Sequence, residues 1–269
     1  MVGRLLALAC ANGRLDNLMD ATLYREKYVA FVDMLGFSNL VRAAAGDAAK
    51  QNKVVSVIER LKDTGCSDPR RGVQISYFSD CLVISGDRTP DGLSSVLFNI
   101  MIIAENLLVV DVLIRGGLTI GEIHHDEQFM FGPGMLEAYD MERFEAKHPS
   151  VLVSPEVRAD IETAKLDHCL FEDADGRRFI HYLLHYANYD PTPRAGVAIL
   201  DDLALLVRHF IARRLNVDEG SPLAKAEWLE AYWNKTVGTN GVLGSVDREG
   251  DLPAPLRPAP FRSIMRITG

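Results

Sequence analysis

The sequence has little of what marks several common protein classes. Its four cysteines, Cys10, Cys66, Cys81 and Cys169, are scattered and form no CxxC pair, which indicates reduced thiols in a cytoplasmic protein. The phosphate-binding pattern GxxxxGK[ST] is absent, and we find no repeat and no low-complexity segment. The chain therefore belongs to neither the disulfide-rich nor the P-loop class.

Positive charge is also in short supply. The chain has 29 Lys and Arg against 37 Asp and Glu, a net charge of -8, which argues against a general nucleic-acid-binding surface. A phosphorylated substrate would need local compensation by a metal ion or an arginine.

No convincing membrane span is present. The apolar run Val96–Leu113 is interrupted by Glu105, Asn106 and Asp111, so it predicts a buried helix and no membrane association. The apolar stretch near the start, Arg4–Cys10, is shorter than a normal signal sequence and is followed by polar residues. We interpret it as a leader or short helix, with secretion as the alternative.

The chain is long and apolar enough to bury a full core, with 269 residues of which 48% are hydrophobic. We expect three parts: a leader at 1–24, one domain at 25–188, and a helical extension with a Gly- and Pro-rich tail at 189–269. The boundary at 188 follows from a change of pattern around Pro191.

Apolar periodicity and turn residues predict the elements of the domain. Strands are expected at Tyr28–Val32, Val73–Ser79, Leu82–Ser85, Ile114–Ile123, Phe129–Phe131 and Val151–Val153, with a last hairpin around Asp175-Gly176. Helices are expected from a Ser38 cap to about Asp63 with a break near Gly46, at Pro90–Val110, at Met135–Ala146, after Ser154, and at Val197–Leu215 and Pro222–Thr236. This order predicts an α+β fold with helices packed on a mainly antiparallel sheet.

Two aspartates stand at the ends of apolar runs. Asp33 follows the strand-like segment that begins at Tyr28, just before the turn residue Gly36. Asp80 follows a second such run, in the turn of the expected 73–85 hairpin. Carboxylates so placed are costly unless they are paired or bind a cation, so we expect a metal site if the two converge. Taken alone, Asp33 could cap the following turn and Asp80 could be an ordinary turn residue.

Four segments, in order and at suitable spacing, resemble the class III nucleotidyl cyclases. They are Phe31-Val-Asp33-Met-Leu-Gly36-Phe37-Ser38, Phe78-Ser79-Asp80, Arg115-Gly-Gly-Leu-Thr-Ile-Gly121-Glu122, and Gly132-Pro-Gly-Met-Leu-Glu-Ala138-Tyr139-Asp-Met-Glu142 with Val151-Leu-Val-Ser154 after it. The resemblance covers about Tyr28 to Ser154. It implies a ferredoxin-like α+β cyclase fold and a homodimer with composite active sites.

The resemblance also implies the chemistry. In this family the ribose 3′-hydroxyl attacks the α-phosphate and expels pyrophosphate, with two Mn²⁺ or Mg²⁺ ions per site. Asp33 and Asp80 would hold the ions, and the Met34 carbonyl would complete one ligand set. The other residues implied to bind substrate are Phe31, Gly36, Phe37 and Ser38, of which the turn through Leu35–Ser38 would receive the triphosphate.

The departures from the family pattern concern the base and the transition state. Purine cyclases recognise adenine with a lysine and an aspartate, whose places are taken here by Ser76 and Pro133. The helix asparagine and arginine that steady the transition state correspond to Leu136 and Asp140. We expect Arg115 to supply the missing catalytic charge, with Arg143 and Lys147 as the alternatives, although Arg115 could be a surface residue at a strand edge.

This deviant pattern resembles the bacterial pyrimidine cyclases of Pycsar anti-phage defence. It implies conversion of UTP to cyclic UMP in the cytoplasm, with CTP as the alternative substrate and a separate effector that responds to the cyclic nucleotide. A degenerate, inactive cyclase-homology domain that binds nucleotide or dimerises is the second hypothesis. A phosphatase with an aspartate nucleophile is disfavoured, because Leu35 stands where its second aspartate would be.

Two further patterns have ordinary explanations. His124 and His125 invite a zinc site, but neighbours in a strand point to opposite faces, so we expect a solvated loop. Trp228, Tyr232 and Trp233 fall at helical spacing and predict packing of the last helix.

Overall fold

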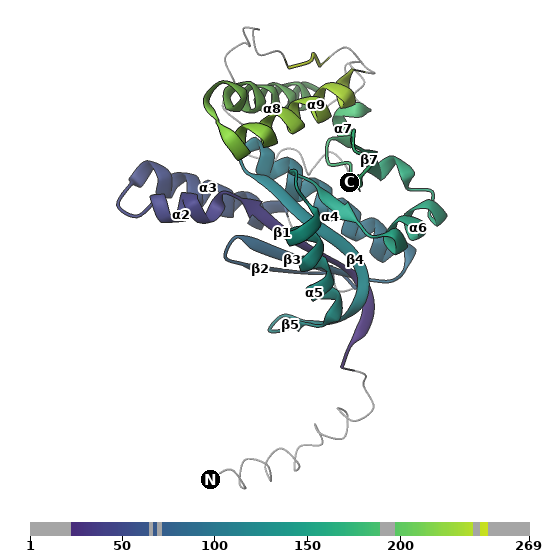
Figure 1. Cartoon of the computed structure of the whole chain (residues 1–269). Coiled ribbons are helices and arrows are strands. Elements are labelled where there is room, and N and C mark those ends of the chain that lie inside the picture. Colours follow the sequence, from purple (N-terminus) through teal and green to yellow (C-terminus); the bar gives the residue numbers. More distant parts are fainter. Residues whose placement is uncertain (1–22, 65–66, 69–71, 189–196, 239–242, 247–269) are drawn as a thin grey trace, which may run out of the picture.

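The computed structural model describes residues 23–64, 67–68, 72–188, 197–238 and 243–246. The predicted leader lies almost entirely outside the described residues, as does most of the tail. The strands form a sheet in the order β2-β3-β1-β4-β6-β8-β7, with β5 paired to β4 (Figure 1). They are β1 Arg25–Leu35, β2 Gln74–Phe78, β3 Cys81–Asp87, β4 Leu113–His125, β5 Met130–Phe131, β6 Val151–Val153, β7 Leu170–Glu172 and β8 Arg178–Ile180.

The helices surround this sheet (Figure 1). They are α2 Phe37–Ala43, α3 Ala48–Thr64, α4 Pro90–Val109, α5 Pro133–Asp140, η2 Met141–Glu145, α6 Pro155–Thr163, η3 Asp167–Cys169, α7 Leu184–Ala187, α8 Val197–Val217 and α9 Gly220–Val237. Among the described strands only β4 and β6 pair in parallel, and every other pair is antiparallel. The predicted α+β class with a mainly antiparallel sheet is confirmed.

The two faces of the sheet are covered differently. Successive residues of a strand point to opposite faces, so β1 sends Tyr28, Ala30 and Val32 into the main core, where they pack with α4. Val29 and Phe31 point the other way, into a smaller cluster that includes Ala138 of α5. The face below α4 is closed, whereas the face below α5 leaves room for a site at the end of β1.

Helix α5 lies directly on β4 because glycines meet at the crossing. A Cβ added to Gly121 would lie 2.5 Å from the Cα of Gly134, so no side-chain layer separates the strand from the helix there. A Cβ at Gly117 would likewise lie 2.5 Å from the Cβ of Met141. The close approach fixes α5 and the residues that follow it against the open face.

Most of the predicted elements are confirmed. The hairpin β2–β3 turns at Ser79-Asp80, α4 begins after the Thr89 cap, and the helix break near Gly46 separates α2 from α3. Two details of the helix prediction are wrong. The cap of α2 is Gly36, at φ 80°, and Ser38 lies inside the helix, because its hydroxyl bonds Asp80 instead of the helix end. The helix expected over 135–146 changes at Met141 into one π-helical turn, closed by the bond from Ala146 N–H to the Met141 carbonyl.

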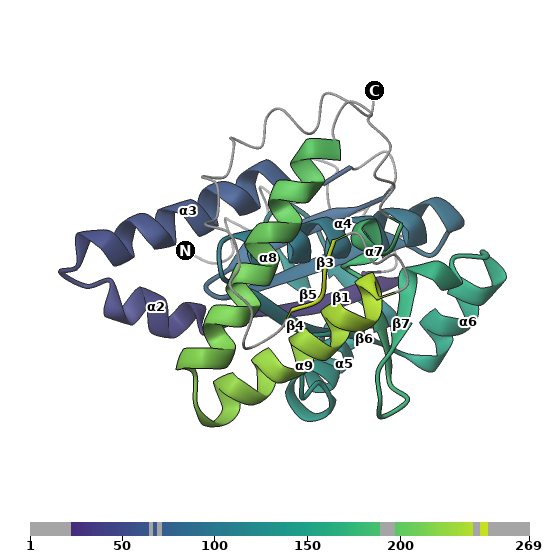
Figure 2. The same ribbon diagram turned by 90° about the horizontal axis from the view of Figure 1, so that it is seen from above.

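The C-terminal extension packs onto the domain, as predicted from its aromatic residues. Trp233 and Tyr232 of α9 are buried in the same core cluster as the sheet. The Tyr232 hydroxyl lies 2.7 Å from His181 Nδ1 and accepts the Leu183 N–H at 3.1 Å. Figure 2 shows α8 and α9 crossing above one end of the sheet.

Among the described residues, one helix is long and apolar enough to cross a membrane by composition. It is α4, which the sequence predicts as a core helix, and most of it is buried inside the protein.

Candidate metal site at the end of strand β1

The structure brings Asp33 and Asp80 together. Asp33 is the ninth residue of β1, and the β2–β3 turn carries Asp80 to the same end of the sheet. The Met34 N–H donates to the Asp80 backbone carbonyl at 2.7 Å, which ties the strand to the turn. Ligand atoms of Asp33, Asp80 and Cys81 all lie within 4.8 Å of one another. The two carboxylates can therefore face one ion or a pair of ions.

The turn that presents Asp80 has a special backbone. Ser79 has a φ of 53°, a left-handed conformation at the first central position of a two-residue hairpin turn. The Ser38 hydroxyl donates a hydrogen bond to the Asp80 carboxylate and is the main cause that lowers its pKa. Asp80 is thus held ionised and oriented from α2.

The surroundings of Asp33, by contrast, disfavour its charged form. Burial, the charge of Glu142 and, to a smaller extent, that of Asp80 raise its pKa to about 6, while Arg115 opposes the shift. Three carboxylates crowd around one guanidinium at this place. A cation between Asp33 and Asp80 would relieve this excess of negative charge, so the donor set fits a bound divalent ion.

Arg115 lies directly opposite Asp33 in the register of β1 and β4. Its guanidinium is ion-paired with Glu142, a buried carboxylate in the π-helical turn η2. The Arg115 Nε atom is buried and has no partner among the described residues. The predicted residue is therefore at the site, with part of its charge already neutralised by a carboxylate that sequence reasoning missed.

Cys81 is the third member of the cluster and was also missed. Its thiol makes long contacts of 3.8 Å and 3.9 Å to the Asp33 and Asp80 carboxylates. Burial first, and then the charges of Asp33 and Asp80, raise its pKa to about 12, so the thiol keeps its proton. A protonated thiol is a poor ligand, and the remaining donors are hard oxygens, which suit Mg²⁺ or Mn²⁺ better than Zn²⁺.

The neighbouring residues of the first motif are arranged around this pair. Phe31 is buried and packs edge-on against Tyr139 of α5 and Phe78 of β2. Phe37 is also buried, which anchors the start of α2 behind the exposed Gly36. Both phenylalanines therefore act on the site through packing.

Ser76, the residue in the place of the purine-reading lysine, makes an unexpected contact. Its hydroxyl lies 2.9 Å from His125 Nε2, and the Ser85 hydroxyl lies 2.8 Å from Nδ1 of the same ring. Burial is the main cause that lowers the His125 pKa to about 4, so the imidazole is neutral. His124 and His125 both lie in strand β4 and pair with β5, so the solvated loop expected at 124–125 is wrong for both residues. His124 bonds Asp126 instead, and the two rings do not share a partner.

Pro133 is far from Asp33 within one chain. The next residue, Gly134, meets Gly121, which pairs with Lys27 of β1, six residues before Asp33 and about 20 Å away along the strand. Leu136 and Asp140 are exposed on the same helix, Leu136 with 64% of its surface accessible. One chain therefore does not bring the predicted base-reading pair of Ser76 and Pro133 to its own aspartates.

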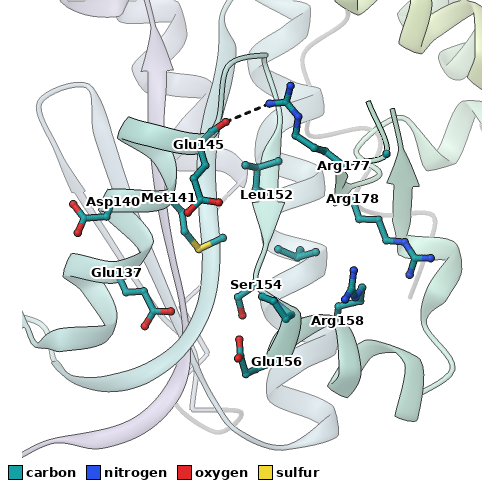
Figure 3. A pocket seen from close by; sticks show the side chains of 13 residues that line it. Glu137, Asp140, Met141, Glu145, Leu152, Ser154, Glu156, Arg158, Arg177 and Arg178 are labelled. Atoms are coloured by element: carbon teal, nitrogen blue, oxygen red, sulfur yellow. Dashed lines mark hydrogen bonds between the residues drawn. The ribbon is translucent and has the colours of Figure 1, made fainter. Parts of the chain in front are cut away.

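A cavity of about 660 Å³ lies away from the aspartates. It lies between α5 with η2 on one side and α6 with the β7–β8 turn on the other (Figure 3). Glu137, Asp140 and Glu145 line one wall, and Arg158, Arg177 and Arg178 line the other. It is a polar, charged cleft on the α5 side of the molecule.

No protein-family model matches the sequence, and no curated protein matches it either. Solved structures do match. The guanylyl cyclase domain of the RhoGC fusion protein from the aquatic fungus Blastocladiella emersonii is 16% identical, covers 58% of this chain and 94% of its own, and gives a TM-score of 0.42. The guanylyl cyclase Cya2 (14% identity, 58% and 90% covered, TM-score 0.39) and an adenylate/guanylate cyclase/hydrolase from Silicibacter pomeroyi (16% identity, 58% and 94% covered, TM-score 0.39) also match. Identities of at most 16% and TM-scores below 0.5 assign no activity to this chain.

Proposed function

We propose that this protein is a metal-dependent nucleotide cyclase that converts UTP to 3′,5′-cyclic UMP and pyrophosphate. The observation that carries the proposal is the convergence of Asp33 and Asp80 at the end of β1, where the bond between Met34 and Asp80 fixes their separation. These are the two residues that the resemblance to class III cyclases assigns to metal binding. Conversion of CTP to cyclic CMP is the alternative reaction.

The donor set suits two Mg²⁺ or Mn²⁺ ions. Asp33 and Asp80 offer carboxylate oxygens, and the Met34 carbonyl is the third oxygen we assign to the site. When bound, the ions would activate the attacking oxygen and neutralise the phosphates. The raised pKa of Asp33 indicates how strongly the site favours a positive charge beside it.

In the proposed reaction the ribose 3′-oxygen forms a bond to the α-phosphorus, and its proton passes to solvent water. The bond between the α-phosphorus and the oxygen that bridges to the β-phosphate breaks, and pyrophosphate leaves with the electron pair. The chain's part is to hold these atoms in line and to balance the negative charge. Arg115 is the guanidinium positioned to do so, since it stands opposite Asp33 on the neighbouring strand.

The pyrimidine assignment follows from the residues in the base-reading places. Ser76 and Pro133 cannot make the paired contacts of a lysine and an aspartate to a purine. Ser76 instead presents a hydroxyl that is tied to the neutral ring of His125. A hydroxyl can both donate and accept a hydrogen bond, which suits the carbonyl and N–H edge of uracil.

We further propose a homodimer with composite sites. Pro133 lies about 20 Å from the aspartates of its own chain, so only a second copy could bring it to them. Large apolar side chains are exposed on the elements that would meet the second copy, namely Tyr77, Phe78, Phe129, Phe131, Leu136 and Phe144. The charged cleft of Figure 3 lies beside the same helix.

A second candidate function is nucleotide binding without turnover. Leu136 and Asp140 occupy the helix positions of the family's transition-state residues, and neither can replace an asparagine or an arginine there. Retention of both metal aspartates favours the enzyme. In either case the protein would act in the cytoplasm without nucleic acid or membrane, and the enzyme's product would reach a separate effector in anti-phage defence.

The test is to incubate the full chain with Mn²⁺ and each of the four nucleoside triphosphates, and to identify the products by mass spectrometry. We expect cyclic UMP from the wild type and a loss of about a thousandfold in Asp33→Asn, because the substitution removes a charged metal ligand. Glu59→Gln, which changes an exposed carboxylate of α3, is the matched control and should leave the rate unchanged. Cyclic CMP would select the alternative substrate, conversion of ATP alone would refute the pyrimidine assignment, and no product from any triphosphate would favour the binding domain.

A further inference from the structure

A second cavity, of about 300 Å³, opens beside the candidate metal site. Its floor is Leu35, Gly36 and Phe37, the residues that directly follow the metal motif, and its roof comes from the C-terminal extension. Figures 1 and 2 show the junction of α8 and α9 next to the start of α2, although the two segments are about 180 residues apart. The extension therefore forms part of the surroundings of the site.

The charges lining this cavity differ in sign from those of the chain as a whole. Three basic side chains, Lys53, Arg214 and Lys225, and a single acidic one, Asp111, line it, in a protein of net charge -8. Two of the three are engaged. Lys53 pairs with Asp111 at 3.1 Å, and Arg214 bonds Asp218 at 3.2 Å and the Asp111 carbonyl at 3.3 Å.

Asp111 itself is already neutralised. Besides Lys53, Arg213 approaches its carboxylate to 2.6 Å, and these partners lower its pKa against the effect of burial, which is the largest single cause and acts in the opposite direction. The backbone of Asp111 has a φ of 65°, a left-handed conformation in which an aspartate is tolerated. The one carboxylate of the cavity is thus already paired with cations of its own.

Lys225 is the exception among the cations. Its ammonium makes no hydrogen bond or ion pair with any part of the chain that the structure describes, although the residue is half-buried. Burial is the main cause that lowers its pKa, the charge of Arg115 adds to the shift, and Asp33 opposes it. Lys225 is therefore close enough to feel the charges of the candidate metal site. A half-buried cation without a partner is costly unless an anion joins it.

We propose that this cavity binds the terminal phosphates of the nucleotide, and that Lys225 of the C-terminal extension is their charge-assisted hydrogen-bond donor. The inference rests on the proposed function and adds a positioning role for the extension in the same chain as the metal aspartates. Gly36 and Phe37 line the cavity and follow Asp33 by three and four residues, so a triphosphate whose α-phosphate lies near Asp33 would extend its tail past the turn toward α9. The same arrangement would retain pyrophosphate after the ring closes.

The test measures polyphosphate binding, which needs no turnover. Inorganic tripolyphosphate is titrated calorimetrically into the full-length protein in the presence of Mg²⁺. We expect Lys225→Met to weaken binding about tenfold, because a charge-assisted hydrogen bond to phosphate is lost. Lys225→Arg should retain most of the affinity. Lys62→Met, which removes the same charge from an exposed position of α3, is the matched control and should bind like the wild type.

The outcomes separate this inference from the proposed function. Equal binding by the wild type and Lys225→Met overturns the inference, as does the absence of tripolyphosphate binding to the wild type. Binding that depends on Lys225 in a protein that forms no cyclic nucleotide would support the inference and refute the cyclase. If the protein is a cyclase, Lys225→Met should raise the KM for the triphosphate more than it lowers kcat, whereas an unfolded variant would show in its far-ultraviolet circular dichroism.

Discussion

The two faces of the sheet use the same strands for different purposes. On the closed face, alternate residues of β1 and β3 pack against α4, and the described side chains there are almost all apolar. On the open face, the intervening residues of the same strands form only a small cluster under α5, and beyond Phe31 the row ends in Asp33. Stability and function are thereby placed one residue apart in the sequence and on opposite sides of the sheet.

The largest loss of stability should come from truncating a buried side chain on the closed face. Ile84 is fully buried in the main core, and Ile84→Ala should cost about 3 kcal/mol of unfolding free energy through lost burial and the cavity that remains. Ile123 is equally buried but belongs to the smaller cluster of the open face. Ile123→Ala should cost about 1 kcal/mol less, because α5 is a short helix that can settle toward the sheet. Urea unfolding of both variants measures the difference, and equal losses would show that the faces are equally packed.

A smaller effect of another kind is expected from the charges of the open face. Arg115→Met should destabilise the protein by about 2 kcal/mol, because it leaves the Glu142 carboxylate buried without its partner. The double variant Arg115→Met/Glu142→Gln should recover most of that stability and none of the cyclase activity. Thermal unfolding and product formation are measured on the same samples. Normal turnover by Arg115→Met would contradict the catalytic role of Arg115 while leaving its structural role intact.

The smallest effect concerns the edge of the open face. Leu136→Glu places a charge in the exposed apolar region of α5 and should weaken self-association about tenfold, while the unfolding free energy of the monomer stays within about 0.5 kcal/mol. Analytical ultracentrifugation reports the association. Leu23→Glu changes an apolar residue of similar exposure ahead of β1 and is the control. A wild type that is monomeric at every concentration would contradict the composite site.

The closed face is what the sequence predicts best. The 3.6-residue spacing of apolar residues in α4 and the strand composition of β1 and β4 are local signals. The structure confirms α4 to within one residue, and it confirms both strands but extends β1 by three residues and β4 by up to two residues at each end. Asp33 and Asp80 were predictable for a related reason, since an ionised residue that ends an apolar run must find a partner. The β2–β3 hairpin turn then brings the Asp80 carboxylate to that of Asp33.

The open face could be predicted only in part. Glu142 reaches Arg115 because the helix after α5 widens into a π-turn. The residue pattern contains no signal that predicts this change from an α-helical to a π-helical turn. Ser38 has the composition of a helix cap, but its hydroxyl bonds Asp80, a contact across 42 residues that outweighs the local preference. Lys225 meets the start of α2 through the packing of two helices that follow the whole domain. Contacts between residues so far apart in the sequence produce no periodic pattern from which they could be predicted.

The single π-turn at Met141–Glu145 also sets a rule for how this chain can change in length. A π-turn closes its hydrogen bond on the fifth residue instead of the fourth, so it holds one residue more than an α-helical turn. Removing one residue between Met141 and Ala146 would therefore restore a regular α-helical turn and keep the segments on either side close to their present positions. The loss would fall on Glu142 and its ion pair with Arg115, while the path of the chain toward β6 would be kept.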